Sequence, residues 1–285
     1  MKKTILMLAL SGALFYSADA QQDTKLSAEF DKVMKEQFPS DGPGVTALVS
    51  SRGNIIYKKA FGMADVELNV PMRTDHIFRI ASITKQFTAV AILQLMEAGK
   101  LNLKDEITRF IPDYPMQGAT ITIEHLLTHT SGIRDFTSIK DTVQRFKMDF
   151  TPTEVISYFQ NQPMRFAPGT KYEYSNSNYF LLGYIIEKIT GKTYAQYLED
   201  HFFKPLGMAN SFYGDDQKLI QNRAAGYTRG QKGIENAVAI SMTQPYAAGA
   251  ILSTVEDLFK WNQALLSYKL VKKETLEKAF TRYKL

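Results

Sequence analysis

The chain has 285 residues, 45% of them hydrophobic, with no cysteine and a formal net charge of +5. The absence of cysteine excludes a disulfide framework, a thiol nucleophile and a lipid-anchored cysteine. The positive charge is mild and dispersed along the sequence, so nucleic acid is not an expected partner. This length suits one large domain or two closely associated subdomains.

The first twenty residues have the pattern of a secretory signal. Lys2 and Lys3 precede a short apolar stretch, and Ala18-Asp19-Ala20 fits a cleavage site. That stretch is too short to span a bilayer, and no later stretch could do so. We therefore do not expect stable membrane insertion. We predict that residues 1–20 are a signal peptide, cleaved near Ala20, and that the remaining chain is periplasmic or secreted.

The chain after this signal begins with one predicted helix and one predicted hairpin. Apolar residues repeat at helical spacing over residues 27–38. Two short apolar strands, residues 45–49 and 55–61, are joined by Ser51-Arg52-Gly53-Asn54, which is typical of a hairpin turn. A polar loop is expected over residues 62–76.

The rest of the chain predicts helices with recognisable ends. Thr151-Pro152-Thr153-Glu154 and Ser253-Thr254-Val255-Glu256 read as capping boxes that open helices. Further helices are expected at residues 179–190, ended by Gly191, at residues 194–203, ended near Pro205, and at residues 274–283. No strand-rich stretch is predicted near the C-terminus.

The central helix is expected to begin at or just before Ser82 and to end at Gly99. Apolar residues occupy nearly all of its faces, which predicts that it is buried. A lysine near the start of a buried helix is costly without partners or a role. Ser82 and Lys85 are three residues apart and therefore share one face. This spacing suits a serine nucleophile whose proton is taken by a lysine amine.

The Ser82-Ile83-Thr84-Lys85 string is weak by itself, because a capping serine followed by a surface lysine has the same spacing. A third group is needed to carry protons to the leaving atom. Tyr174-Ser175-Asn176 is a candidate, in a loop that could present a phenol and an amide to a cleft. Capping of the following helix by Ser177 or Asn178 would leave Asn176 free for this purpose.

Several longer strings occur in an order that is found in one known family. They are Phe78-Arg79-Ile80-Ala81-Ser82, His125-Leu126-Leu127-Thr128-His129-Thr130-Ser131-Gly132, Pro168-Gly169, Pro205-Leu206-Gly207-Met208, and Gly249 with Ser253-Thr254 before Asp257-Leu258. From about Gly44 to Trp261 the chain resembles the serine β-lactamase and penicillin-binding-protein family, which carries the S-x-x-K motif. It is most similar to the class C branch, with its related esterases and D-alanyl peptidases.

The resemblance implies an α/β (α+β) fold, with an antiparallel sheet flanked by helices and a helical subdomain. The α/β part would cover about 21–80 and 245–285, and the helical part about 100–240. Ser82 would attack a carbonyl to form an acyl-enzyme, Lys85 would accept its proton, and Tyr174 would relay protons. Asn176 would bind Lys85 and the substrate amide. Which of Lys85 and Tyr174 is the general base stays open.

The family's third motif, Lys- or His-x-Gly on a late strand, has no counterpart here, since no Lys, His, Arg or Trp is followed two residues later by Gly. In the family this strand binds the substrate carboxylate and supplies the second oxyanion N–H, beside that of Ser82. We therefore expect residues 21–285 to be an incomplete domain with its C-terminal strands missing. Either a truncated record or an inactive copy would explain this.

The implied function is hydrolysis of a β-lactam, a D-alanyl peptide or an ester, with a small-molecule or peptidoglycan-derived substrate and a monomeric enzyme. The competing interpretation is a non-catalytic cell-wall peptide binder or an inactive fragment. No cofactor is implied, and no metal site is predicted. His125 and His129 have the spacing of a zinc-binding helix, but Leu126 stands where that motif needs glutamate.

Overall fold

The computed structural model describes residues 25–139 and 145–283. The predicted signal peptide therefore lies outside the described residues. The chain divides into two compact units, one of Met1–His76 with Asn222–Asn236 and the other of Ile77–Gln221 with Ala237–Leu285. We refer to them as unit 1 and unit 2. The subdivision near residues 80, 100 and 240 stays a prediction.

Unit 1 contains the predicted helix and hairpin. Residues 25–37 are helical, and strands β1 (Val45–Ser51) and β2 (Asn54–Phe61) pair antiparallel in a two-stranded sheet. Arg52 and Gly53 between them both have positive φ, 48° and 81°. Two successive residues with positive φ are typical of the tight turns that match strand twist. The hairpin prediction is confirmed, with strands longer by one or two residues.

The remainder of unit 1 contains short strands that the sequence did not predict. Strands β3 (Met63–Asp65) and β4 (Val70–Pro71) form within the expected polar loop, and β7 (Tyr227–Gly230) pairs with β8 (Gly233–Asn236). The hydroxyl of Tyr227 donates to the Glu67 carboxylate, which attaches this second hairpin to the loop. Strands of two to four residues are too short to show alternating hydrophobicity.

Unit 2 contains a three-stranded sheet in the order β5-β9-β6. Strand β9 (Ile251–Ser253) is central and pairs antiparallel with β5 (Phe78–Arg79) and with β6 (Phe212–Tyr213). All three β9 residues are buried. The sequence did not predict β9, which is a single strand of three residues. The expected combination of helices with antiparallel sheet is confirmed.

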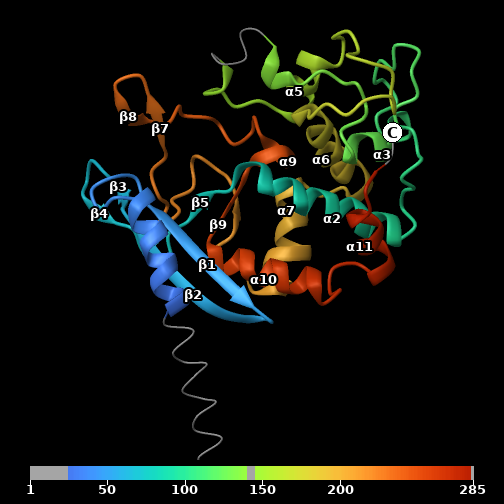
Figure 1. Cartoon of the computed structure of the whole chain (residues 1–285). Coiled ribbons are helices and arrows are strands. Elements are labelled where there is room, and N and C mark those ends of the chain that lie inside the picture. The colour runs from blue at the N-terminus through green and yellow to red at the C-terminus, as the bar shows by residue number, and fades with distance from the viewer. Residues whose placement is uncertain (1–24, 140–144, 284–285) are drawn as a thin grey trace, which may run out of the picture. The chain divides into compact units, whose positions relative to one another are not determined.

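Helices make up most of unit 2 (Figure 1). In chain order they are η1 (Ala81–Ile83), α2 (Thr84–Glu97), η2 (Ile107–Arg109), α3 (Ile123–Leu127), η3 (Phe136–Ser138), α5 (Pro152–Phe159), α6 (Asn176–Thr190), α7 (Tyr194–Leu198), η4 (Glu199–Phe203), α8 (Lys204–Leu206), α9 (Tyr246–Gly249), α10 (Val255–Leu266) and α11 (Lys273–Phe280). Helices α2, α6 and α9 pack against one another. None of the described helices is long and apolar enough to cross a bilayer.

The core of unit 2 is built around α2, as its apolar faces predicted. Phe87 is completely buried, and its ring stacks on Trp261 of α10 at a centroid distance of 3.8 Å. Phe202 contacts both rings edge-on. Burial of large aromatic side chains contributes strongly to core stability. The core thus fixes α2, and with it the residues at its N-terminus.

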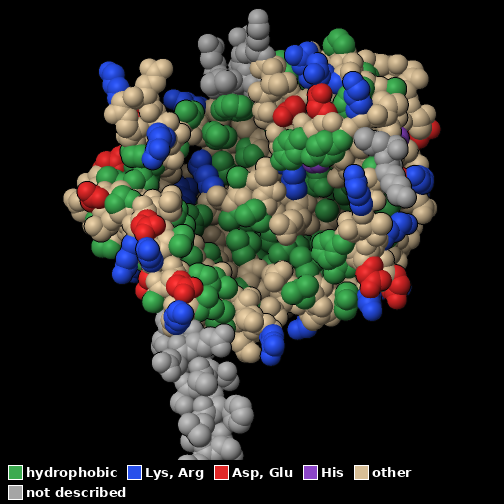
Figure 2. All heavy atoms as spheres, viewed as in Figure 1, with side chains coloured by type: hydrophobic (Ala, Val, Ile, Leu, Met, Phe, Trp, Pro, Cys, Tyr) green, Lys and Arg blue, Asp and Glu red, His purple; other side chains and the backbone are tan. Residues whose placement is uncertain are grey.

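Several predicted helix ends are confirmed. Gly99 and Gly191 follow the ends of α2 and α6 with a φ of 69° each. Thr151 caps α5 in a capping box with Glu154, with proline at the first turn. Figure 2 shows charged side chains of both signs scattered over the face in view, in agreement with the dispersed charge of the sequence.

Other helix ends differ from their predictions. Helix α6 begins at Asn176, three residues early, and no side chain caps it. The helix expected to end near Pro205 runs on to Leu206 and ends at Gly207, because proline at the first turn of α8 needs no N–H partner. Thr254 caps α10 by accepting from the N–H of Asp257, so the predicted box with Glu256 does not form.

Candidate active site

Ser82 lies on the surface in the short helix η1, which directly precedes helix α2. Ala81, the residue before it, has a φ of 45°, a backbone conformation that residues with a side chain seldom adopt. The N–H of Ile80 donates to the carbonyl of Ile251, so strand β9 holds the approach to this turn. The hydroxyl of Ser82 is thereby presented at a fixed turn instead of within regular helix.

Lys85 is buried, with only 7% of its surface exposed. Its Nζ donates to Ser82 Oγ at 3.2 Å, to Asn176 Oδ1 at 2.9 Å and to the carbonyl of Ala248 at 2.9 Å. These three acceptors match the three N–H bonds of an ammonium group. Ser82, Asn176 and Ala248, which lie in three separate parts of the sequence, therefore all accept hydrogen bonds from the same lysine.

Burial lowers the pKa of Lys85 from its usual 10.5 to about 8, and the Asp135 carboxylate opposes this shift. A buried ammonium loses hydration, which disfavours its charged form. At pH 7 about one molecule in ten then carries the neutral amine. A neutral Lys85 can accept the proton of Ser82, whereas the charged form cannot, so this site can supply a base near neutral pH.

Tyr174 completes a triangle with Ser82 and Lys85. Its hydroxyl lies 2.8 Å from Ser82 Oγ, and Lys85 Nζ lies 4.7 Å from the centre of its ring. Tyr174 is 42% exposed. The structure therefore brings the predicted lysine and the predicted phenol each within hydrogen-bond distance of the predicted nucleophile.

Asn176 lies in the first turn of α6. Its Oδ1 accepts from Lys85, and its Nδ2 donates to the Asp135 carboxylate, at 3.1 Å to Oδ2 and 3.4 Å to Oδ1. A carboxylate accepts hydrogen bonds and cannot donate them, so it fixes which end of the amide faces Lys85. Asn176 thus links the lysine to a carboxylate.

Sequence analysis did not single out Asp135. Its side chain caps the short helix η3 through the N–H of Thr137, and it also accepts from the hydroxyl of Thr137. Its other contact, with Asn176, places a negative charge close enough to favour protonated Lys85. An aspartate before a short helix is common as a cap. Its second role could not be found without the fold.

His129 packs against Tyr174 and accepts a hydrogen bond from the residue that follows it. Its Nδ1 accepts from the N–H of Ser175 at 3.1 Å, and its ring lies 4.5 Å from the ring of Tyr174 and 5.1 Å from that of Tyr179. Burial, together with the charge of Lys85, lowers the pKa of His129 from 6.5 to about 4, so the ring is neutral at pH 7. His125 has separate contacts, at Thr122.

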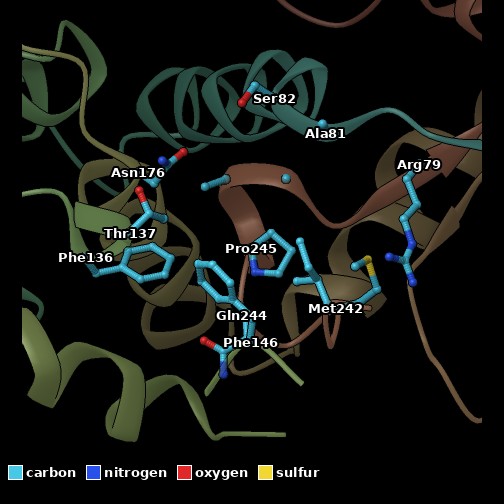
Figure 3. Close-up of a pocket in the computed structure, with 13 residues that line it drawn as sticks. Arg79, Ala81, Ser82, Phe136, Thr137, Phe146, Asn176, Met242, Gln244 and Pro245 are labelled. Atoms are coloured by element: carbon cyan, nitrogen blue, oxygen red, sulfur yellow. The ribbon is translucent and has the colours of Figure 1, made fainter. Parts of the chain in front are cut away.

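A pocket opens directly beside Ser82 (Figure 3). It has a volume of about 230 Å³. Besides Ser82 and Asn176, it is lined by Arg79, Ala81, Phe136, Thr137, Phe146, Ile240, Met242, Gln244, Pro245, Ala248 and Gly249. Most of this lining is apolar, and all of it belongs to unit 2.

Comparison with known proteins identifies the family. A profile described as Beta-lactamase matches residues 30–285. The Bacillus subtilis protein PbpX is 35% identical over 237 residues, which cover 83% of this chain and 58% of PbpX. The Staphylococcus aureus protein flp is 34% identical over 224 residues, covering 77% of this chain and 44% of flp. The chain thus spans about half the length of these curated relatives.

Solved structures agree with this assignment. A penicillin binding protein from Bacillus halodurans matches with a TM-score of 0.78 and 29% identity, over 89% of this chain and 78% of that one. A D-amino acid amidase from Ochrobactrum anthropi SV3, complexed with D-phenylalanine, matches with a TM-score of 0.73 and 30% identity, over 82% and 69%. The chain belongs to the beta-lactamase family and has the fold of its solved relatives.

Proposed function

We propose that the protein is an exported serine hydrolase that acts through an acyl-enzyme on Ser82. The observation that carries this proposal is that Ser82 Oγ lies within 3.2 Å of both Lys85 Nζ and the Tyr174 hydroxyl. A serine is a weak nucleophile until a neighbouring group takes its proton. Lys85, with its lowered pKa, and Tyr174 are both placed to do so.

In the proposed reaction, Ser82 Oγ bonds to the carbonyl carbon of the substrate. Its proton passes to Lys85 or Tyr174 and then to the leaving nitrogen or oxygen, whose bond to the carbonyl breaks. A water molecule then attacks the acyl-enzyme, gives one proton back to Ser82 and releases the carboxylic acid. Asn176 would hold Lys85 in register throughout and bind the substrate amide.

The proposed substrates are β-lactams, D-alanyl peptides or esters. The similarity to a penicillin binding protein and to a D-amino acid amidase supports acyl transfer from small amides or peptides. Conserved fold alone does not select among these substrates, because loops and pocket walls set the choice. Hydrolysis rates on a β-lactam, a D-Ala-D-Ala peptide and a short-chain p-nitrophenyl ester would rank them.

The alternative function is non-catalytic binding of cell-wall peptides. Labelling with a fluorophosphonate and with a fluorescent penicillin separates the two functions. We expect covalent label on the wild type, loss of the label in Ser82→Ala, and unchanged label in the matched control Ser267→Ala, directly after helix α10. Well-folded wild-type protein that takes neither label would overturn the hydrolase and favour the binder.

Export is proposed from the sequence pattern of residues 1–20, with cleavage near Ala20. Expression with the full N-terminus, cell fractionation and N-terminal sequencing of the mature protein would test it. A mature protein that begins at Met1 in the cytoplasm would contradict this proposal without affecting the proposed chemistry at Ser82.

A further inference from the structure

The pocket beside Ser82 has walls of a distinct chemical character. Its lining includes the apolar side chains of Phe136, Phe146, Ile240, Met242 and Pro245 besides the polar Ser82 and Asn176. Figure 3 shows Phe136, Phe146, Met242 and Pro245 below Ser82 in the view, and we refer to the apolar part of the lining as the far wall. A concave apolar surface with a few polar groups at one edge is typical of a ligand site.

Hydrogen bonds to the backbone hold these walls in place. The N–H of Phe136 donates to Ser177 Oγ at 2.9 Å, and the N–H of Met242 donates to Asp216 Oδ2 at 3.1 Å. Both Phe136 and Met242 are buried. The far wall is therefore formed before any ligand arrives, which reduces the entropy lost on binding.

Phe146 is held by the segment opposite to it. The N–H of Ser241 donates to the carbonyl of Phe146 at 2.7 Å. The buried Gln244 donates from Nε2 to the carbonyls of Arg145 and Met148, at 3.2 and 2.9 Å. The turn that carries Phe146 is thus attached to the wall on both sides, although the Phe146 side chain itself is only partly buried.

Small residues line the pocket near the nucleophile. Ala81, Ser82, Ala248 and Gly249 form this part of the lining, and the side chains of Ala248 and Gly249 are the smallest available. A carbonyl carbon bonded to Ser82 Oγ would carry its substituent past these small residues toward the apolar walls.

We propose that this pocket binds the acyl side chain of the substrate, and that it selects uncharged acyl groups of about the size of a benzyl group. This inference rests on the proposed function of Ser82 as an acyl-forming nucleophile. It adds the chemical class of the acyl group, which the family alone does not give.

The volume supports a group of this size. A sealed apolar cavity of about 150 Å³ in another protein binds benzene. The present pocket, at about 230 Å³, has room for an aromatic ring and one methylene. An acetyl group would leave most of the apolar wall in contact with water, so its ester would lose the free energy gained by burying that surface.

The charge of the lining supports the selection against charged groups. Among the residues that the structure describes, Arg79 is the one charged residue that lines the pocket, and its guanidinium already pairs with Asp216 at 3.3 Å. A carboxylate buried among the phenylalanines and Met242 would lose its hydration without gaining a free partner. Acyl groups that carry a charge on the ring should therefore react more slowly.

The test measures kcat/KM for p-nitrophenyl esters with acetyl, phenylacetyl, 4-carboxyphenylacetyl and 2-naphthylacetyl groups, each divided by its rate of hydrolysis by hydroxide. In each turnover, Ser82 Oγ replaces p-nitrophenolate on the carbonyl, and water then releases the acid. We expect phenylacetyl to exceed acetyl by roughly 10- to 100-fold, the range for small apolar groups in pockets. The 4-carboxyphenylacetyl ester should have a kcat/KM about tenfold lower than that of the phenylacetyl ester.

Two variants of Phe146 change the pocket in opposite directions. Phe146→Trp should fill it and lower the phenylacetyl-to-acetyl ratio about tenfold, and Phe146→Ala should raise the naphthylacetyl-to-phenylacetyl ratio about fivefold. Phe280→Ala, at an exposed phenylalanine of α11 outside the pocket, is the matched control and should leave both ratios unchanged. Thermal melting confirms that each variant is folded.

Three results overturn the inference. One is a wild-type ratio near one in a protein that fluorophosphonate labels at Ser82. Another is a ratio that neither Phe146 variant changes. The third is the absence of any Ser82-dependent label or ester turnover, which overturns the proposed function at the same time. The labelling therefore distinguishes a failure of the pocket from a failure of the nucleophile.

Discussion

The two sides of Ser82 are built from different interactions. On one side, Lys85, Asn176 and Asp135 form a chain of hydrogen bonds in which each polar group faces a defined partner. On the other, the pocket presents mainly apolar surface and shape. Directional bonds fix a proton-transfer geometry, whereas apolar walls discriminate by size and tolerate modest change. Substitutions on the polar side should therefore alter rate, and those on the pocket side should alter preference.

Replacement of Lys85 should have the largest effect, and that effect should be on rate and not on substrate preference. Lys85→Met keeps the length of the side chain and removes the amine, so acylation of Ser82 by a fluorophosphonate or an ester should fall by roughly 10²- to 10⁴-fold. The preference between phenylacetyl and acetyl esters should persist in the residual rate. Lys100→Met, at an exposed lysine, serves as control. Labelling of folded Lys85→Met at the wild-type rate would contradict its role as a base.

Asp135 should have a smaller effect that depends on pH. Its negative charge favours the protonated form of Lys85, so Asp135→Asn should lower the pKa of that amine further. The free amine would then appear at lower pH, and the rising limb of acylation against pH should shift in the acid direction. The plateau should fall about tenfold, because Asn176 loses the partner that orients its amide.

The pH profile separates this positioning role from a purely structural one. Loss of structure would lower the plateau without moving the limb. The exposed Asp113→Asn variant provides the matched control for removing one negative charge. An unmoved limb in folded Asp135→Asn would show that Asp135 does not influence Lys85.

The smallest expected effect concerns His129, and it is an effect of pH on the free energy of unfolding. The pKa of its ring is lowered in the folded protein to about 4, below its unfolded value of 6.5. Between these values the unfolded chain binds a proton that the folded chain does not. The free energy of unfolding should therefore decrease as pH falls from about 6.5 to about 4. This contribution is complete above pH 6.5.

Two substitutions separate the hydrogen bond that His129 accepts from the packing of its ring. His129→Gln keeps an acceptor for the N–H of Ser175 and loses the ring, whereas His129→Phe keeps a ring and leaves that buried N–H unpaired, at a cost of about 1–3 kcal/mol. Both should weaken the acid dependence of denaturant unfolding relative to wild type, in which the other histidines still titrate. An unchanged slope in both variants would exclude His129 as its source.

The four residues predicted for the site lie in two short motifs, which the resemblance to a known family singled out. Ser82 and Lys85 share one helical turn, and Tyr174 and Asn176 share one loop. Asp135 and His129 could not be found in this way, because they meet the site only through tertiary contacts across about 40 residues. An aspartate before a helix and a histidine after one are also common without any such role.

The same distinction applies to the fold. The β1–β2 hairpin and the ends of α2 and α6 follow from turn residues and glycines that act locally. Strand β9 has three residues, and its burial depends on β5 and β6, which lie far away in the sequence. The start of α6 at Asn176 was missed because Ser177 and Asn178 are typical capping residues. Here both are buried, and Ser177 instead bonds to the segment at Arg134–Phe136.

The hairpin of unit 1 has a consequence for the protein in concentrated solution. Strands β1 and β2 pair only with each other in the part of the chain that the structure describes, so each has an outer edge of backbone N–H and C=O groups. Such edges can accept a further strand from another molecule. Self-association by strand addition should therefore grow with concentration.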